Sequence, residues 1–370
     1  MIYSNLIIHQ KIWKQLETMV ENKKLPPCLI FHGPKGTGKE AHAIELAYLL
    51  NQNEQDDEKT KKFQHPNINL TIPFPREKNI SKKSDAIGAL SEKSLELLIN
   101  MKQEKMHSPY KRIFFEKASS ILINSIRDIK KNTRFTLLGR NDYTIYLIFE
   151  AEKLCAPKRE AGNALLKILE EPPKNTLFIL VTDSKEKILD TILSRSCDFY
   201  FPKLSKSLIE NYLKNQNYQT DESIPLLYKL CDGNLTDIIN IIDLNWDIQK
   251  MKKEAITLID DLIKNKKWHH HYEMLEGLFR TKKEKLKIFI KLIIFILYDL
   301  EKIKNKYSDC LILKDIKKVR NLDYFGCIET LENTYQNLYK NLNPAIGLFA
   351  MMIEIKQILL TKKEINVVHE

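Results

Sequence analysis

A glycine-rich run between an apolar stretch and a helix-forming one constrains this chain most. Gly33-Pro34-Lys35-Gly36-Thr37-Gly38-Lys39 follows Leu29–Phe31 and precedes Ala41–Leu50. Strand, loop and helix in this order predict a phosphate-binding loop, whose backbone N–H groups surround phosphates while the lysine reaches the outer ones. The candidate phosphate contacts are Gly33, Gly36, Thr37, Gly38 and Lys39. The alternative is a plain glycine-rich turn, with Glu40 favoured by the positive end of the following helix.

Two positions that would hold magnesium carry the wrong residue types. Ser or Thr follows the lysine of a working loop and ligates Mg²⁺, but here Glu40 follows it, and its carboxylate would repel phosphate oxygens. The β-rich run Tyr143–Phe149 ends in Phe149 where an aspartate would organise the metal, although Glu150 is kept. We therefore expect no metal site, and a nucleotide site without working hydrolytic machinery.

The composition bounds the class of protein. The 370 residues carry a net charge of +11, which suits either a polyanionic partner or a lysine-rich proteome. Six cysteines lack metal-ligand spacing, which predicts reduced thiols in a cytoplasmic protein. Met1–Gln10 does not resemble a signal peptide, and Ile288–Leu300 is too short to cross a bilayer and contains charges. We expect a buried helix there and no membrane partner.

The pattern of predicted secondary structure changes near residue 203. Before it, β-rich runs such as Thr176–Thr182 alternate with helical segments, which predicts a parallel sheet covered by helices. After it, the pattern is helical, with a pair of short helices over Asp221–Asp243 that turn at Asp232-Gly233-Asn234, and longer helices over Lys250–Lys362. The predicted division is an α/β nucleotide-site domain over 1–203, a helical lid over 204–249 and a helical C-terminal domain over 250–370. The stretch 76–117 is predicted to be an insertion, and no chemistry is visible in it.

A resemblance to a known family appears in two further motifs. Asn163-Ala164-Leu165-Leu166-Lys167-Ile168-Leu169-Glu170-Glu171-Pro172-Pro173, followed by Thr191-Ile192-Leu193-Ser194-Arg195-Ser196, resembles the clamp-loader branch of the AAA+ family. That branch includes the γ/τ and δ′ subunits of bacterial DNA polymerase III and their replication factor C relatives. The resemblance implies an AAA+ P-loop domain with helices on both faces of a parallel sheet, a small helical lid and an all-α collar. In that collar, Leu338–Leu359 would hold ring-forming helices, although an intramolecular core explains its apolar spacing equally well.

The resemblance also implies residue roles. In the family, an arginine at the position of Arg195 enters a neighbouring subunit's nucleotide site as an arginine finger, although Arg195 could also be an ordinary surface arginine. Active members carry a nucleotide-sensing arginine in the lid, and Thr236 stands at that position. The groups serving the chain's own site are thus altered at Glu40, Phe149 and Thr236, whereas the group serving a neighbour is kept. This asymmetry is typical of the δ′ class.

Partners and cofactors follow from the same resemblance. A δ′-like chain would join γ/τ and δ subunits in a hetero-oligomeric ring that loads a sliding clamp on primed DNA, without turning over ATP. Whether ATP or ADP still binds, and whether Lys282–Lys291 touches DNA, is left open by the sequence. No zinc is expected, because Asn51–His65 lacks cysteine and His269–His271 is typical of a solvated helix surface. The alternatives are a γ/τ-like ATPase that tolerates its substitutions, or a non-replicative AAA+ scaffold for nucleic acid.

Overall fold

The computed structural model divides the chain into two compact units. It describes residues 1–51, 63–81, 84–132, 143–218, 224–264, 266–307, 311–313, 322–337 and 344–365. The first unit comprises Met1–Gln219 and Gly233–Asn240, and the second comprises Thr220–Asp232 and Ile241–Glu370. Each unit is described by itself below.

A five-stranded parallel sheet forms the centre of the first unit. Its strand order is β2-β3-β4-β1-β5, and every neighbouring pair is parallel. The strands are β1 (Cys28–His32), β2 (Ile68–Thr71), β3 (Thr144–Phe149), β4 (Thr176–Thr182) and β5 (Cys197–Tyr200). The central strand β4 is buried along its whole length, as expected for a parallel sheet covered on both faces.

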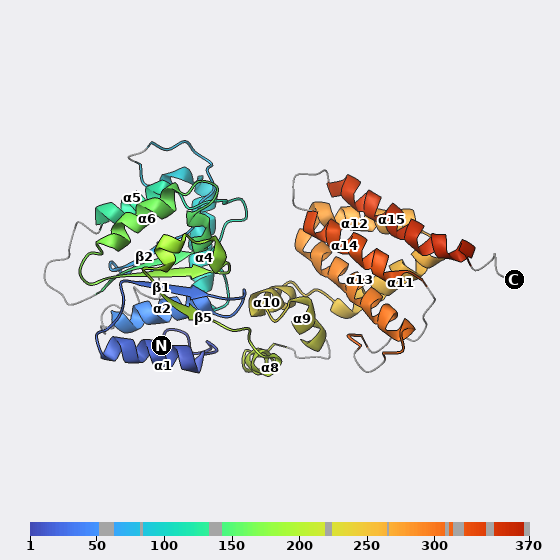
Figure 1. Ribbon diagram of the computed structural model, residues 1–370, viewed down its shortest axis with the longest axis horizontal. Coiled ribbons are helices and arrows are strands. Elements are labelled where there is room, and N and C mark those ends of the chain that lie inside the picture. The colour runs from blue at the N-terminus through green and yellow to red at the C-terminus, as the bar shows by residue number, and fades with distance from the viewer. Residues whose placement is uncertain are drawn as a thin grey trace. The chain divides into compact units, whose positions relative to one another are not determined.

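Helices cover both faces of this sheet (Figure 1). α5 (Ile123–Asn132) and α6 (Glu160–Glu170) lie on one face, and α2 (Lys39–Leu50) lies on the other with α1 (Gln10–Glu21) beyond it. An apolar core between the sheet and α5 and α6 includes Ile126, Tyr146, Leu165 and Phe178. Its members are apolar at strand and helix spacing, so burial of one face of each element fixes the layer order.

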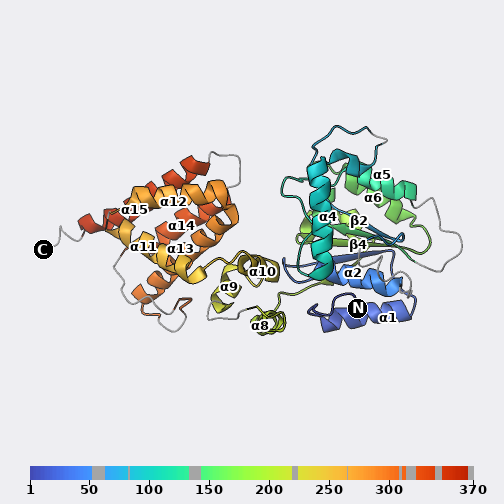
Figure 2. The same cartoon turned by 180° about the vertical axis from the view of Figure 1, so that it is seen from behind.

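The stretch predicted to be an insertion contributes a helix of its own. η1 (Ala86–Ala89) is a short 3-10 turn, and α4 (Glu92–His107) begins at Ser91, whose side chain accepts a hydrogen bond from the backbone N–H of Ser94. Figure 2 shows α4 running past the sheet from the level of α5 to that of α2. The end of α4 therefore reaches the region where α2 begins.

Short helices follow the sheet. α8 (Lys206–Asn215) belongs to the first unit, α9 (Ile224–Leu230) belongs to the second, and α10 (Leu235–Asp243) begins in the first. The predicted turn between α9 and α10 is present, with Asp232 at φ 52° and Gly233 at φ 69°. The predicted lid over 204–249 and the boundaries on either side of it stay predictions.

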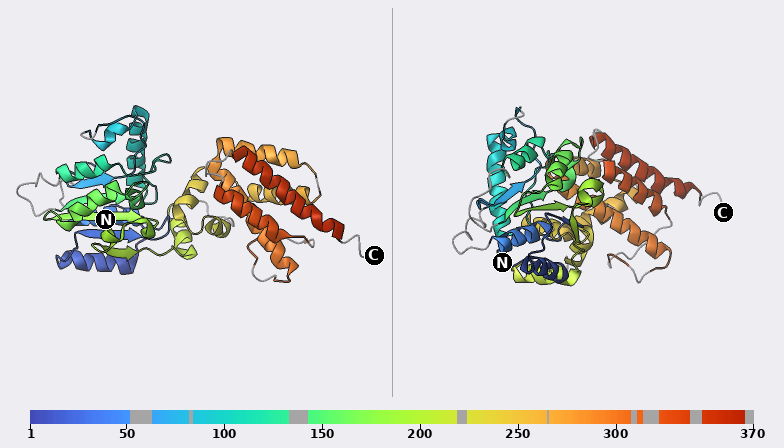
Figure 3. Two further views of the ribbon diagram at one scale, coloured as in Figure 1. Left: turned by 45° about the horizontal axis from the view of Figure 1, so that its top comes forward. Right: turned by 60° about the vertical axis from the view of Figure 1, so that its left-hand side comes forward.

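The second unit is a bundle of long helices (Figure 3). They are α11 (Ile248–Ile263), α12 (Trp268–Thr281), α13 (Lys283–Lys304), α14 (Tyr324–Asn337) and α15 (Pro344–Ile365). α13 packs against α11, α12 and α14, and eleven of its side chains are buried, which confirms the buried helix predicted over Ile288–Leu300. Cys310 and residues 338–343 of the predicted ring-forming run lie outside the described residues.

The fold class predicted from the sequence is confirmed: a parallel sheet with helices on both faces precedes an all-helical C-terminal region. Within the described ranges, no helix has the length and apolar character that crossing a membrane requires.

Candidate functional site

The predicted phosphate loop joins β1 to α2, as its sequence context indicated. Gly38 precedes the first residue of α2 and lies at φ 84°. Gly36 lies at φ 72°, and a Cβ atom on it would be 2.0 Å from Asn234 Oδ1 and 2.6 Å from the backbone nitrogen of Leu235. Glycine is required there for both reasons, and the start of α10 therefore lies directly against the loop.

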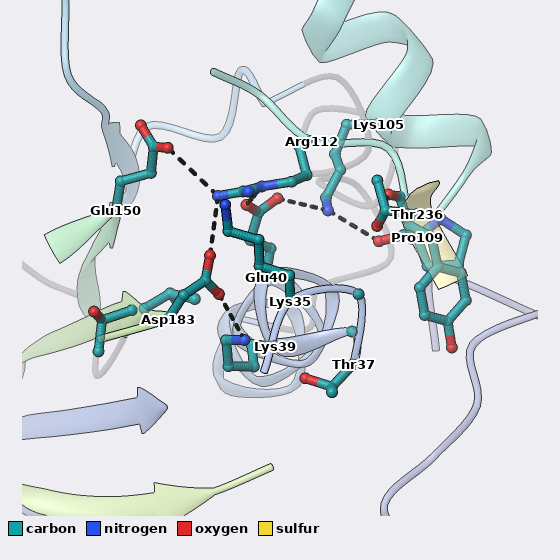
Figure 4. Close-up of a pocket in the computed structure, with 15 residues that line it drawn as sticks. Lys35, Thr37, Lys39, Glu40, Lys105, Pro109, Arg112, Glu150, Asp183 and Thr236 are labelled. Atoms are coloured by element: carbon teal, nitrogen blue, oxygen red, sulfur yellow. Dashed lines mark hydrogen bonds and ion pairs between the residues drawn. The ribbon is translucent and has the colours of Figure 1, made fainter. Parts of the chain in front are cut away.

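The sheet topology brings charged groups together at one edge. The carboxyl ends of β3, β4 and β1 are adjacent, so Glu150, Asp183 and the loop meet there. Lys39 Nζ lies 2.9 Å from Asp183 Oδ1 and donates to the carbonyl oxygens of Gly33 at 2.8 Å and Pro34 at 2.5 Å. These contacts use all three donors of the ammonium group. Figure 4 shows Lys39 turned toward Asp183 beneath the guanidinium of Arg112.

Glu40 is paired with two cations from the predicted insertion. Lys105 Nζ lies 2.8 Å from Glu40 Oε2, and Arg112 Nε lies 3.5 Å from Glu40 Oε1 (Figure 4). Lys105 also donates to the carbonyl oxygen of Pro109 at 2.9 Å. Residues 76–117, in which no chemistry was visible from the sequence, thus supply Lys105 and Arg112, which line the site and neutralise the carboxylate expected to repel phosphate.

The pKa shifts record how strongly these charges are coupled. Burial lowers the pKa of Lys105, and the facing Glu40 only partly offsets this. Burial likewise lowers the pKa of Lys39 against the opposing effect of Asp183. Burial alone would raise the pKa of Asp183, but the charges of Lys39 and Arg112 outweigh it and hold that pKa below its ordinary value. The carboxylates around Arg112 outweigh burial in the same way and raise its pKa.

The other positions altered relative to an active nucleotide site lie around the same edge. Phe149 is fully buried at the end of β3 and offers no ligand to a metal. Glu150, the next residue, lies 2.8 Å from Lys153 and 3.4 Å from Arg112. Thr236, at the first turn of α10, is buried and donates its hydroxyl to the carbonyl oxygen of Tyr110 at 2.8 Å. It thus binds the protein's own backbone.

A magnesium-bound nucleotide does not fit these residues. The cavity between the loop and Arg112 has room of about 30 Å³, enough for about two water molecules, whereas ligand sites measure roughly 300–1,000 Å³. The lysine that would reach the outer phosphates has its donors filled by the chain itself. Neither Glu40 nor Phe149 supplies the metal ligand that a working site has at its position. These ion pairs instead join residues of the loop, α2, α4 and the ends of β3 and β4 to one another.

Arg195 lies at the opposite edge of the sheet from this loop. It follows α7 (Asp190–Leu193) and precedes β5, whereas the loop follows β1, and the two neighbouring strands are parallel. The two sites are therefore separated by the length of the strands, about 20 Å at 3.3 Å per residue. The Arg195 side chain is 40% exposed, donates to the carbonyl oxygen of Thr191 at 3.0 Å and lies 3.5 Å from Glu170 Oε1.

Two histidines hold the backbone of the loop. His42, fully buried on α2, binds the carbonyl oxygen of Gly38 through Nδ1 at 2.9 Å and accepts the backbone N–H of His9 through Nε2 at 3.3 Å. His9 Nε2 lies 3.0 Å from the carbonyl oxygen of Thr37. Burial lowers the pKa of His42 to about 3. A neutral His42 on α2 therefore holds the backbone of the loop in place at Gly38.

A correction applies to the other histidine cluster. His269 and His270 are exposed, as predicted for a solvated helix surface, but His271 is buried and its Nε2 lies 3.0 Å from Asp261 Oδ2. Asp261 lies on α11, ten residues before His271, so the residues next to the histidines in the sequence did not indicate this pairing.

Comparison with known proteins assigns the family. The model of a family described as DNA polymerase III, delta subunit, matches residues 8–205, more than half of the 370 residues. The chain belongs to the DNA polymerase III delta subunit family. The clamp-loader resemblance inferred from the sequence motifs is thereby confirmed.

Three relatives align with this chain over different shares of its length and of their own. The DNA polymerase III subunit delta′ of Bacillus subtilis is 24% identical over 84% of this chain and 82% of its own length. The tau subunit of the same organism is 26% identical over 71% of this chain and 39% of its own. The gamma subunit of Buchnera aphidicola subsp. Schizaphis graminum is 35% identical over 35% of this chain and 36% of its own. The chain thus spans about two-fifths of these tau and gamma relatives.

Three residues of this chain's site were missed from the sequence. Asp183 carried a usable signal, because it directly follows a predicted buried strand whose carboxyl end lies at the site edge. Lys105 and Arg112 carried none, because they lie in a charged stretch with many other lysines and acquire a role only where α4 reaches α2.

Proposed function

We propose that this chain is a δ′-type clamp-loader subunit that does not turn over ATP and serves a neighbouring γ/τ subunit's ATPase site through Arg195. The alignment with a delta′ subunit, which takes in most of both chains, supports the class. The single observation that carries the proposal is the contrast between the two edges of the sheet: the chain's own loop is filled by ion pairs, while Arg195 is exposed at the other edge.

The geometry of Arg195 supports action in trans. Its own phosphate loop lies about 20 Å away along parallel strands, beyond the reach of an arginine side chain. Its present contacts are a carbonyl oxygen and one exposed carboxylate, and an exposed ion pair of this kind contributes little, about 0–1 kcal/mol. A neighbour's triphosphate can therefore compete for the guanidinium at small cost.

The partners proposed are those of the family's clamp loaders: γ/τ and δ subunits in a hetero-oligomeric ring, with the sliding clamp and primed DNA engaged through the complex in the cytoplasm. We propose no bound nucleotide, metal or zinc for this chain. Direct contact with DNA through the lysines of α13 is a secondary proposal, supported by the net charge of +11.

The test is ATP hydrolysis by the reconstituted complex of this chain with its host's γ/τ and δ subunits, clamp and primed DNA. Arg195→Ala should leave the complex assembled and lower hydrolysis at the site served by the finger by roughly 10³–10⁵-fold. Arg195→Lys should restore little of it, since an ammonium lacks the planar fork of donors. Arg280→Ala is the matched control, because Arg280 is 72% exposed on α12 of the second unit.

The opposite results are equally informative. Unchanged complex hydrolysis with Arg195→Ala would reject the arginine finger. Hydrolysis by the purified wild-type chain alone, lost on Lys39→Met, would instead identify a γ/τ-like ATPase.

A further inference from the structure

The degenerate site contains an acid that faces two cations in a closed space. Glu40 is 9% exposed and Lys105 is 1% exposed, and their charged groups are 2.8 Å apart. Arg112 approaches the second oxygen of the same carboxylate at 3.5 Å. A buried ammonium group with no anion nearby is strongly unfavourable, so these cations require a negative partner at this position.

The location of that partner is chemically specific. Glu40 occupies the first turn of α2 directly after the loop, where the positive helix end and the loop amides favour an anion. In working phosphate loops, the helix end and the loop amides hold the phosphoryl oxygens of the nucleotide and their metal ion. Here a carboxylate of the chain has taken the place of an external anion as the partner of Lys105 and Arg112.

The segment that carries the cations is fixed on several sides. Lys105 Nζ binds the carbonyl oxygen of Pro109, and the hydroxyl of Thr236 binds the carbonyl oxygen of Tyr110. The hydroxyl of Tyr110 accepts the backbone N–H of Ile7 at 3.0 Å. A Cβ atom on Gly38 would lie 3.4 Å from the Tyr110 ring, so this segment packs directly on the loop. The segment that carries Lys105 and Arg112 therefore occupies space beside the loop that an external ligand would need.

We propose that Glu40 is a built-in substitute for a phosphoryl group, which keeps the phosphate site filled by the chain itself and holds α2, α4 and the first turn of α10 together without nucleotide. The cations recruited by Glu40 are those that would recognise an oligophosphate. Replacing Glu40 by threonine removes the charge and shortens the side chain, so the site should then accept a free phosphate ion beside Lys105 and Arg112.

The charge balance gives the expected direction. In the wild-type chain, Glu40, Glu150 and Asp183 face Lys39, Lys105 and Arg112. Glu40→Thr leaves Lys105 with the carbonyl oxygen of Pro109, while Arg112 keeps Glu150 and Asp183. The charge beside the loop thus becomes more positive by one, and an anion binds more favourably where it previously met a carboxylate.

The experiment is calorimetric titration of the full chain with inorganic phosphate. Wild type should bind with a Kd above about 1 mM, and Glu40→Thr should bind at least about tenfold more tightly. Glu40→Thr combined with Lys105→Met should lose that gain. Glu45→Thr is the matched control, because Glu45 is a buried carboxylate on the same helix that accepts the backbone N–H groups of Ile2 and Tyr3 instead.

Two outcomes would overturn the proposal: phosphate binding by wild type with a Kd below about 1 mM, or equal affinities of wild type and Glu40→Thr, which restores the hydroxyl of a working loop. If Glu40→Thr does not fold, Glu40→Ser and the wild-type titration still decide. Arg195 lies at the other edge of the sheet, so either result would leave the arginine-finger proposal untouched.

Discussion

The ion pair between Lys105 and Glu40 should couple the predicted insertion to the phosphate loop in the free energy of unfolding. At 2.8 Å and an effective dielectric constant of about 20, the Coulomb attraction is about 6 kcal/mol before desolvation is subtracted. Breaking a buried pair by removing one partner costs about 3–5 kcal/mol, because a charge stays behind without compensation. The two single variants should nevertheless differ.

Glu40→Gln leaves Lys105 buried with the Pro109 carbonyl oxygen and should cost about 3–5 kcal/mol. Lys105→Met leaves Glu40 with Arg112 at 3.5 Å and should cost less, about 1–3 kcal/mol for the carbonyl left unpaired. The double variant leaves no uncompensated charge from the pair. It should therefore be more stable than the sum of the single losses predicts, by about 2 kcal/mol.

The assay is urea unfolding of the full chain followed by fluorescence. Trp13 belongs to the first unit, whereas Trp246 and Trp268 belong to the second, so a background with both of the latter replaced by Phe reports the first unit alone. Losses that add within about 0.5 kcal/mol would show that the two residues are not coupled and would refute the argument.

Two further predictions concern the loop. Gly36→Ala should destabilise the first unit by about 1–3 kcal/mol, because φ is +72° and the new Cβ would meet Asn234 and the Leu235 backbone; Gly88→Ala, whose nearest neighbour would be Ile80 at 3.6 Å, should change stability by less than about 0.5 kcal/mol. In the second prediction, the His42 pKa is lowered from 6.5 to about 3, so its contribution is complete above pH 6.5 and is lost as the pH falls toward 3, by at most about 1.4 kcal/mol per pH unit. Urea unfolding across this pH window should show a shallower slope for His42→Gln, and parallel slopes would contradict the assignment.

Much of the first unit could be predicted because its signals are local. Leu29–Phe31 and Thr176–Thr182 are short apolar runs bounded by turn residues, and both are strands of the sheet. Gly36 and Gly38 adopt positive φ angles, as a phosphate loop requires. The turn at Asp232 and Gly233 was equally visible, because few residues other than Gly, Asn and Asp adopt this conformation.

The site could be predicted only in part because its partners are distant in the chain. Glu40 was recognised as incompatible with magnesium, but its pairing with Lys105 joins residues 65 positions apart. His271 was similarly assigned to a solvated surface, although α11 places Asp261 beside it. Periodicity shows that a helix has a polar face; it does not show which other element that face meets.

The sequence by itself determined that this chain has a phosphate loop without its magnesium ligands, a parallel sheet and a helical C-terminal region, because these features depend on residue types at short spacing. Only the tertiary structure decided that the loop is filled from within and that Arg195 lies at the opposite sheet edge. Both depend on which elements become neighbours when the chain buries its apolar surface, and that outcome is cooperative rather than local.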